Sequence, residues 1–230
     1  MILFYQPALP ESNFLDLEES KHCVKVLRKT NGDEISVLDG KGQLYNCLIT
    51  NASHKKCEFE ITSTSSFDRH DRYRHIAIAP TKNNDRIEWF VEKATEIGID
   101  EISFIACDHS ERSNLKIDRI EKKAISAMKQ SLKYYLPKLN SLVSFKEFIT
   151  SQKASPNYKA IAYVDFENPV QLIDQLKDQE SIVCLIGPEG DFSQQEVSLA
   201  QQAGFEKVAL GNSRLRTETA GIVSCHLMNL

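Results

Sequence analysis

Residues 71–230 alternate short apolar runs with amphipathic helical patterns, and this alternation most restricts what the chain can fold into. Apolar runs of strand length occur at residues 76–79, 102–107, 160–164, 182–186 and 208–210. Helical patterns lie between or after them, at residues 86–97, 113–135, 193–204 and 217–230. Strands that are apolar throughout must be covered on both faces, so the pattern predicts an α/β fold around a mainly parallel sheet.

Residues 1–70 have a different pattern. Strand-like runs at residues 34–38, 44–49 and 57–61 follow one predicted helix at 22–28, and a Gly-containing turn separates the first two runs. Closely spaced strands of this kind predict a small β-barrel. The polar residues 62–71 are expected to form a linker. We therefore predict two domains, at residues 1–70 and 71–230.

Composition disfavours several classes of protein. The six cysteines are scattered without a Cys-x-x-Cys pair, so buried reduced thiols are expected and a metal site is not. No apolar run approaches the length of a membrane span, and the first residues lack the pattern of a signal peptide. A cytoplasmic protein is expected.

The charge is unevenly distributed. The formal net charge is −4, which gives no global indication of nucleic-acid binding. Residues 112–138 nevertheless contain eight Lys or Arg and only two acids. This basic stretch is either a solvated helix face or a surface for a phosphate backbone, and charge alone does not distinguish the two.

Two glycine-containing turns lie in the last fifth of the chain, at residues 187–190 (Gly-Pro-Glu-Gly) and 211–216. Each follows an apolar run and precedes a helical pattern, and Ser193 and Thr217 are predicted to cap the two helices. Such turns either only connect elements or form the ligand site of an α/β sheet. Neither is a Gly-x-Gly-x-x-Gly motif or a P-loop, so nicotinamide and nucleoside triphosphate sites lose their main support.

Five segments in the same order resemble the ribosomal RNA small subunit methyltransferase E family, a branch of the SPOUT superfamily. They are residues 22–33, 82–98, 130–137, 187–190 and 210–220, which span nearly the whole chain. The chain departs from the family pattern at Asp191, where a second glycine is common, at Ser213-Arg214, and at Lys133, where Arg is common.

The resemblance implies a SPOUT-type α/β methyltransferase domain with a C-terminal trefoil knot, preceded by a PUA-like β-barrel. It also implies a homodimer that holds S-adenosyl-L-methionine in the loops of the knot. The corresponding cofactor-binding residues are Leu185, Ile186, Gly187, Pro188, Glu189, Gly190, Leu210, Gly211, Asn212, Leu215, Arg216, Thr217, Thr219 and Ala220.

The reaction implied by the resemblance is methylation of N3 of a uridine in 16S ribosomal RNA of the small subunit. Uracil N3 carries a proton at neutral pH, so a base, or a cation that stabilises the uracil anion, is needed. Arg216 is the predicted cation, and Glu218 is a candidate base or orienting group. The residues expected to contact RNA are His22, Lys25, Arg28, Lys29, Arg112, Lys129 and Lys133.

Two alternatives stay open at this point. One is a non-catalytic RNA-binding or ribosome-assembly protein that keeps the fold. The other is a SPOUT enzyme that acts on a different nucleotide. The intact turns at residues 187–190 and 210–220 count against the first alternative.

Overall fold

The computed structural model describes residues 2–111, 114–164, 170–177 and 179–230. The chain divides into two compact units. One consists of residues up to 69 together with 125–136, and the other of residues 70–124 and 137–230. Within the described ranges, no helix has both the length and the apolar character needed to cross a membrane.

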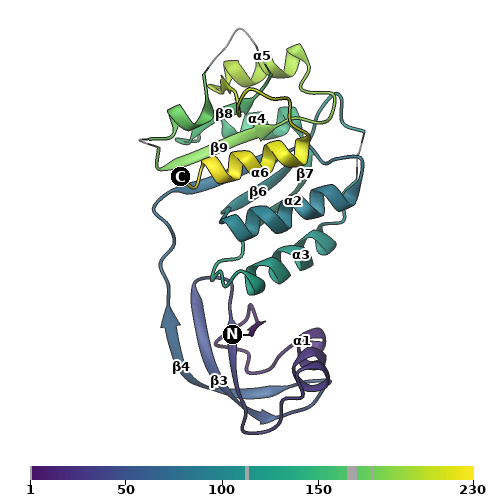
Figure 1. Ribbon diagram of the computed structural model, residues 1–230, viewed down its shortest axis with the longest axis vertical. Helices are drawn as coiled ribbons and strands as arrows, with labels where there is room; N and C mark the ends of the chain where they lie inside the picture. The colour runs from purple at the N-terminus through teal and green to yellow at the C-terminus, as the bar shows by residue number, and fades with distance from the viewer. Residues whose placement is uncertain (1, 112–113, 165–169, 178) are drawn as a thin grey trace. The chain divides into compact units, whose positions relative to one another are not determined.

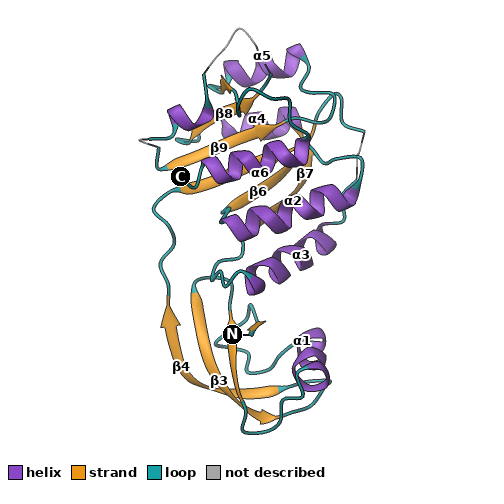
Figure 2. Ribbon diagram, in the orientation of Figure 1, coloured by secondary structure: helices purple, strands orange, loops and turns teal. Residues whose placement is uncertain are grey.

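The first unit contains a four-stranded sheet in the order β1-β2-β3-β4; β3 and β4 are labelled in Figure 2. The strands are β1 (Leu3–Tyr5), β2 (Glu34–Leu38), β3 (Gln43–Asn51) and β4 (Glu58–Ser66). β1 lies parallel to β2, and the other two pairs are antiparallel. A helical segment precedes β2 in the chain: α1 (Leu17–Lys21) continues into the π-helical turn η1 (His22–Val26). The core of this unit is made by side chains such as Phe4, Leu15, Val37, Ile49 and Phe59.

Two expectations for this unit were wrong. The polar residues 62–66 belong to β4, which pairs with β3 as far as Ser66, rather than to a linker. Their Ser and Thr side chains are mostly exposed, so the strand is held by its backbone ladder and carries little hydrophobic signal. The helical segment also begins earlier than residue 22, because Asp16 caps the backbone N–H of Glu19 at 2.8 Å. β1 was not predicted.

The first unit also includes a later segment, residues 125–136. Met128, Tyr134 and Leu136 pack with Leu3, Leu38 and Leu44 of the sheet. The rings of Phe67 and Tyr134 stack with centroids 3.5 Å apart. The helix predicted at 113–135 is therefore shorter: α3 (Ile117–Gln130) ends before Leu132, whose φ is 55°.

The second unit is built on a six-stranded sheet in the order β10-β8-β9-β5-β6-β7, in which every pair is parallel. Its strands are β5 (Tyr73–Ile78), β6 (Glu101–Ala106), β7 (Lys138–Ser144), β8 (Tyr158–Ala162), β9 (Ser181–Ile186) and β10 (Glu206–Val208). The predicted α/β fold with a parallel sheet is confirmed. β7 and the helix after it, α4 (Phe145–Gln152), were not predicted, because β7 mixes polar and apolar side chains.

Helices cover both faces of this sheet. α2 (Asn84–Ile97) and α6 (Thr217–Leu227) lie side by side on one face (Figure 1). α4 and α5 (Gln194–Gln202) supply Phe148, Val197 and Ala200 to the core on the other face. α5 begins with the predicted capping box, in which Ser193 and Glu196 bond each other's backbone N–H groups. A short 3-10 turn, η2 (Leu172–Gln175), precedes β9.

The strand order determines where the glycine turns meet. β10, β8 and β9 are neighbours although they are separated in sequence. Because these strands are parallel, the loops that follow them leave the same edge of the sheet. The loop after β8, the turn at 187–190 and the turn at 211–216 are thereby brought together.

Candidate cofactor and catalytic site

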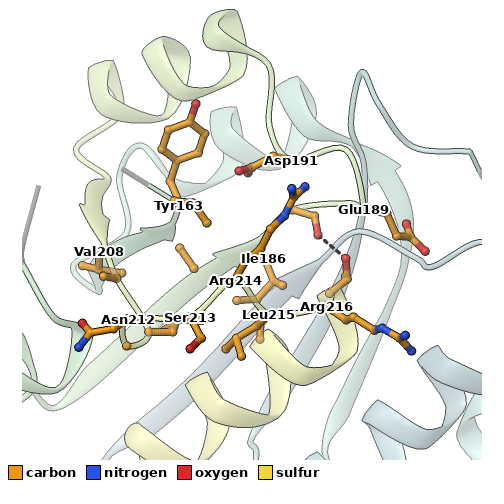
Figure 3. Close-up of a pocket in the computed structure, with 18 of the residues that line it drawn as sticks. Tyr163, Ile186, Glu189, Asp191, Val208, Asn212, Ser213, Arg214, Leu215 and Arg216 are labelled. Atoms are coloured by element: carbon orange, nitrogen blue, oxygen red, sulfur yellow. Dashed lines mark hydrogen bonds between the residues drawn. The ribbon is translucent and has the colours of Figure 1, made fainter. Parts of the chain in front are cut away.

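A cavity of about 540 Å³ lies at the carboxyl ends of β8, β9 and β10. Three segments supply most of its wall: residues 162–164, residues 186–189 with Asp191, and residues 208–217. Figure 3 shows Tyr163 of the loop after β8, Ile186 at the end of β9 and Leu215 of the second glycine turn around one space. The wall combines apolar side chains with exposed loop backbone, a combination suited to an organic ligand that has both apolar and polar parts.

The two glycine turns are bonded to each other. Thr217 Oγ1 donates a hydrogen bond of 3.0 Å to the carbonyl oxygen of Gly187 (dashed line in Figure 3). Thr217 is buried and is the first residue of α6, where Arg216 occupies the N-cap position without a side-chain cap. The prediction that Thr217 caps this helix was therefore wrong, because its hydroxyl is used to join the turns.

The first turn is also held from a loop after β6. His109 Nδ1 lies 3.1 Å from the carbonyl oxygen of Gly190 and 2.9 Å from that of Asp191. Both oxygens can only accept, so Nδ1 carries the hydrogen and donates to them. On the other side, the backbone N–H of Lys82 donates to Glu189 Oε1 at 3.2 Å. The turn is therefore anchored on both sides.

Asp191 occupies the position where the family often has glycine, and its φ is 62°. Asp tolerates this left-handed conformation better than most residues. Burial raises the pKa of its carboxyl, while the hydrogen bond from Phe192 N–H and the charges of Arg214 and His109 oppose that rise. Figure 3 shows the Arg214 side chain extending toward Asp191. The departure from the family pattern thus keeps the turn and adds a partly buried carboxyl to the cavity wall.

Most predicted cofactor-binding residues line this cavity, and three do not. Leu185 is fully buried in the sheet core, and neither Gly190 nor Thr219 reaches the cavity wall. The predicted residues that line it are Ile186, Gly187, Pro188, Glu189, Leu210, Gly211, Asn212, Leu215, Arg216, Thr217 and Ala220.

Sequence reasoning missed one side of the cavity. It is formed by the loop after β8, with Tyr163 and Val164, and by Gln171, which bridges to Ala209. The remaining residues missed are Ala162, Asp191, Val208, Ala209, Ser213 and Arg214. The sequence did mark this side, because the apolar run at 160–164 ends there. Only the strand order shows that the loop after this run adjoins the two glycine turns.

The two candidate catalytic residues, Arg216 and Glu218, both line a hollow on the α2 side of the cavity. The Arg216 side chain points away from Leu215 and Ser213 (Figure 3), and it lines a second hollow against α2. Glu218 also lines that hollow; it is buried, and its Oε1 lies 3.7 Å from Arg86 Nε. Glu218 Oε2 has no hydrogen-bond partner among the described residues. The pairing with Arg86 favours an orienting role for Glu218 over that of a base.

The predicted RNA-contacting residues differ in exposure and in whether they bond other groups of the protein. Lys25 and Arg28 are exposed, and Lys29 Nζ donates to the carbonyl oxygen of Glu34 at 3.1 Å. Lys129 is ion-paired with Glu19, a residue of the same unit. His22 and Lys133 are partly exposed, and Arg112 lies outside the described residues.

Several cations in the described part of the basic stretch are ion-paired with acids from other segments. Arg119 Nε lies 2.6 Å from Glu88 Oε1, and Lys123 Nζ lies 3.9 Å from Glu92 Oε2. Lys138 Nζ lies 3.0 Å from Glu101 Oε1. Part of the local positive charge is therefore already paired within the protein. No cluster of metal-binding side chains occurs in the described part of the chain, and all six cysteines are buried and form no disulfide.

Comparisons with known proteins relate the chain to RNA methyltransferases. A family model described as an RNA methyltransferase PUA domain matches residues 15–62. The small subunit methyltransferase E of Mesomycoplasma hyopneumoniae is 26% identical over 96% of both chains. That of Aquifex aeolicus is 28% identical over 94% of this chain and 95% of its own.

Solved structures show the same fold over nearly the whole chain. A probable rRNA-methyltransferase from Porphyromonas gingivalis is 42% identical with a TM-score of 0.88, covering 98% of this chain and 95% of its own. The small subunit methyltransferase E of Neisseria gonorrhoeae, bound to S-adenosyl methionine, is 27% identical with a TM-score of 0.84, covering 99% and 96%. A family model described as an RNA methyltransferase domain matches residues 70–229. The chain therefore belongs to this RNA methyltransferase family.

Proposed function

We propose that this protein transfers a methyl group from S-adenosyl-L-methionine to N3 of a uridine in 16S ribosomal RNA of the small subunit. The observation that carries the proposal is the cavity formed by the two bonded glycine turns at residues 187–190 and 211–216. Relatives named for small-subunit rRNA methylation match almost the entire chain, and one of them holds this cofactor in its structure.

The cavity fits the proposed cofactor. Ile186, Leu210 and Leu215 provide apolar cover for an adenine ring, and the loop backbone provides polar groups for its edge and for the ribose. An added Cβ at Gly211 would meet nothing within 4 Å, so this part of the wall is open space that a ligand can occupy. When bound, the cofactor supplies an electrophilic methyl group on a sulfonium.

The chain's own residues would prepare the acceptor. Uracil N3 must lose its proton to solvent or to a base before it attacks the methyl carbon. The N3–carbon bond then forms as the sulfur–carbon bond breaks, and the electron pair of that bond stays on sulfur. Arg216, at the boundary between the cavity and the second hollow, would stabilise the uracil anion through its guanidinium.

The proposal includes the organisation of the molecule. We infer an RNA-binding domain at residues 1–70 and a methyltransferase domain at residues 71–230, whose C-terminal segment threads a trefoil knot. We also infer a homodimer that works in the cytoplasm. Sedimentation at micromolar concentration tests the dimer, and a monomeric mass would contradict it.

The deciding experiment uses radiolabelled S-adenosyl-L-methionine and small ribosomal subunits from cells that lack this activity. The expected result is label in 3-methyluridine at one site. Label in another nucleoside would keep the fold and reject the uridine assignment. Cofactor binding without any transfer, on free rRNA as well as on subunits, would support the non-catalytic alternative.

A further inference from the structure

A second hollow lies beside the cofactor cavity and shares a wall with it. Arg86 and Trp89 of α2 form one side of this hollow, and Glu218 of α6 lies in its lining. Residues 214–216 line both the hollow and the cavity, so one stretch of chain separates them. A methyl acceptor must sit next to the methyl donor, and this hollow has that position.

Trp89 gives the hollow an exposed aromatic face. It is the single tryptophan of the chain, and 46% of its surface is exposed. The next residue, Phe90, is fully buried against α6. One aromatic ring of α2 therefore packs in the core, and the ring of Trp89 is exposed to solvent. Exposed indole rings beside guanidinium groups are typical stacking surfaces for unpaired bases.

The ion pair with Glu218 holds the Arg86 guanidinium beside the hollow. Glu218 is 6% exposed, and a buried carboxylate is costly unless a charge or hydrogen bonds compensate it. The Arg86 guanidinium 3.7 Å away provides that compensation, and 40% of its side chain stays exposed. Arg86 is thereby held at the hollow while part of it can still reach a ligand.

We propose that this hollow binds the target uracil, an inference that rests on the proposed function. Trp89 stacks on the base, Arg86 and Arg216 donate to its two carbonyl oxygens, and Glu218 positions Arg86. Uracil presents an acceptor on each side of N3, and two guanidinium groups match that pattern. Cytosine replaces one acceptor with an amino donor, which a guanidinium repels. The hollow is therefore specific for uracil.

The single tryptophan allows a direct binding test. The probe is the rRNA fragment that contains the nucleoside mapped by methyl labelling, added to wild-type protein with S-adenosylhomocysteine to prevent turnover. We expect saturable quenching of Trp89 fluorescence by this fragment and none by the cofactor product alone. A fragment with cytidine at the target position should need about tenfold more RNA for half-quenching, within the range of one lost base contact.

Two results would overturn the inference. RNA that binds in a filter assay without changing the emission would show that no base reaches Trp89. An emission change that depends on protein concentration without RNA would show that a second copy of the chain covers Trp89 instead.

Variants separate this inference from the proposed function. Trp89→Ala should raise KM for the RNA about tenfold or more, as expected for one lost stacking contact, and leave the affinity for S-adenosyl-L-methionine unchanged. Trp89→Phe keeps an aromatic face and should restore KM to within about threefold of wild type. A wild-type KM in Trp89→Ala would reject the base site while 3-methyluridine formation still stands. Failure of the wild-type protein to form 3-methyluridine would instead reject the proposed function.

A further variant tests the positioning role of Glu218. Glu218→Gln removes the charge that holds Arg86 and should relax the preference for uridine over cytidine fragments. Arg86→Lys should have the same effect, because lysine cannot donate in the planar geometry of a guanidinium. Unchanged discrimination in both variants would remove this pair from recognition.

Discussion

Single residues in the two glycine turns show how the chain combines a tight turn with a ligand cavity. Asp191 keeps a left-handed φ of 62° without being glycine. Thr217, in the sequence position of a cap, instead bonds the carbonyl of Gly187. Both side chains serve the cavity wall, and at Thr217 the local preference for helix capping is overridden where the site is built.

Arg216 tests the proposed chemistry at this scale. Arg216→Ala should lower kcat about 100-fold or more, the usual cost of removing one group that stabilises a developing anion. Arg216→Lys keeps the charge and should recover part of the loss. A single-turnover assay measures the rate of methyl transfer, and calorimetry measures whether the variants still bind the cofactor. An Arg216→Ala enzyme with wild-type kcat would end the role proposed for this residue.

Gly211 tests the cofactor cavity. Its φ is +118° and an added Cβ would meet nothing within 4 Å, so Gly211→Val would place a strained side chain at the cavity wall. We expect cofactor affinity to fall about tenfold or more, because occupied cavity space excludes the ligand. Gly32→Val is the matched control: Gly32 has a φ of +87° and equally open surroundings, but it lies in the other unit. Equal cofactor affinities in the two variants would contradict the assignment of the cavity.

At the scale of elements, the contact between α2 and α6 depends on Gly221. A Cβ there would lie 2.6 Å from the buried ring of Phe90 and 3.0 Å from Ile78 Cδ1. Gly221→Val should therefore destabilise the protein by about 1–3 kcal/mol, the usual cost of overpacking a core. Urea denaturation measures the change, with the exposed His226→Ala on the same helix as control. Equal midpoints for both variants would show that the helices separate at little cost.

A buried polar cluster joins β5, β6 and β7. His75 Nε2 lies 2.8 Å from Ser103 Oγ, and Asn140 bonds both Ser103 and Glu101. Burial lowers the pKa of His75 to about 4. Burial would raise the pKa of Glu101, but attraction to His75 and hydrogen bonds from Tyr73, Asn140 and Lys138 lower it to about 2. The folded protein thus holds His75 neutral and Glu101 charged.

Acid should weaken the fold through this cluster. His75 has its usual pKa of 6.5 when unfolded and about 4 when folded, so the unfolded chain binds the proton first and stability falls as pH drops from 6.5 to 4. The contribution of His75 to this loss of folding stability is on the order of 2–3 kcal/mol. Glu101 extends the loss from pH 4.5 to about 2. Urea midpoints between pH 7 and 4 should fall less steeply in His75→Gln; parallel curves would contradict the assignment to His75.

At the scale of the whole molecule, some basic residues are ion-paired with acids of the same protein, and others are exposed to solvent. The basic stretch at 112–138 supplies ion pairs to Glu88, Glu92 and Glu101. The exposed Lys25 and Arg28 lie on the unit matched by the PUA family model. RNA contact in the first unit is therefore expected to depend on fewer cations than the sequence count indicates.

Salt dependence of RNA binding tests this division. Replacing Lys25, Arg28 and Lys133 with Gln should lower the slope of log affinity against log salt by about 2, since each phosphate contact contributes about 0.7–0.9. Lys123→Gln removes a cation already paired with Glu92 and should leave the slope unchanged. A larger change from Lys123→Gln than from the triple variant would place the RNA on the other unit.

Local patterns were sufficient for much of the fold. The apolar runs around Ile76, Ile102, Ala160 and Val183 predicted strands that the structure contains, and the Ser193–Glu196 capping box was predicted correctly. β7 and the end of β4 were missed, because their polar side chains leave no period-two apolar signal.

The sequence by itself determined the fold class, the two glycine turns and the family of the chain, because these depend on short-range periodicity and on motifs. Only the tertiary structure decided that β10, β8 and β9 are neighbours, that Tyr163 and Gln171 complete the cavity, and that Arg86 lies beside Glu218. The physical reason is that strand order and side-chain pairing are properties of non-local packing. Residues more than 100 positions apart meet because the sheet must bury both faces at once.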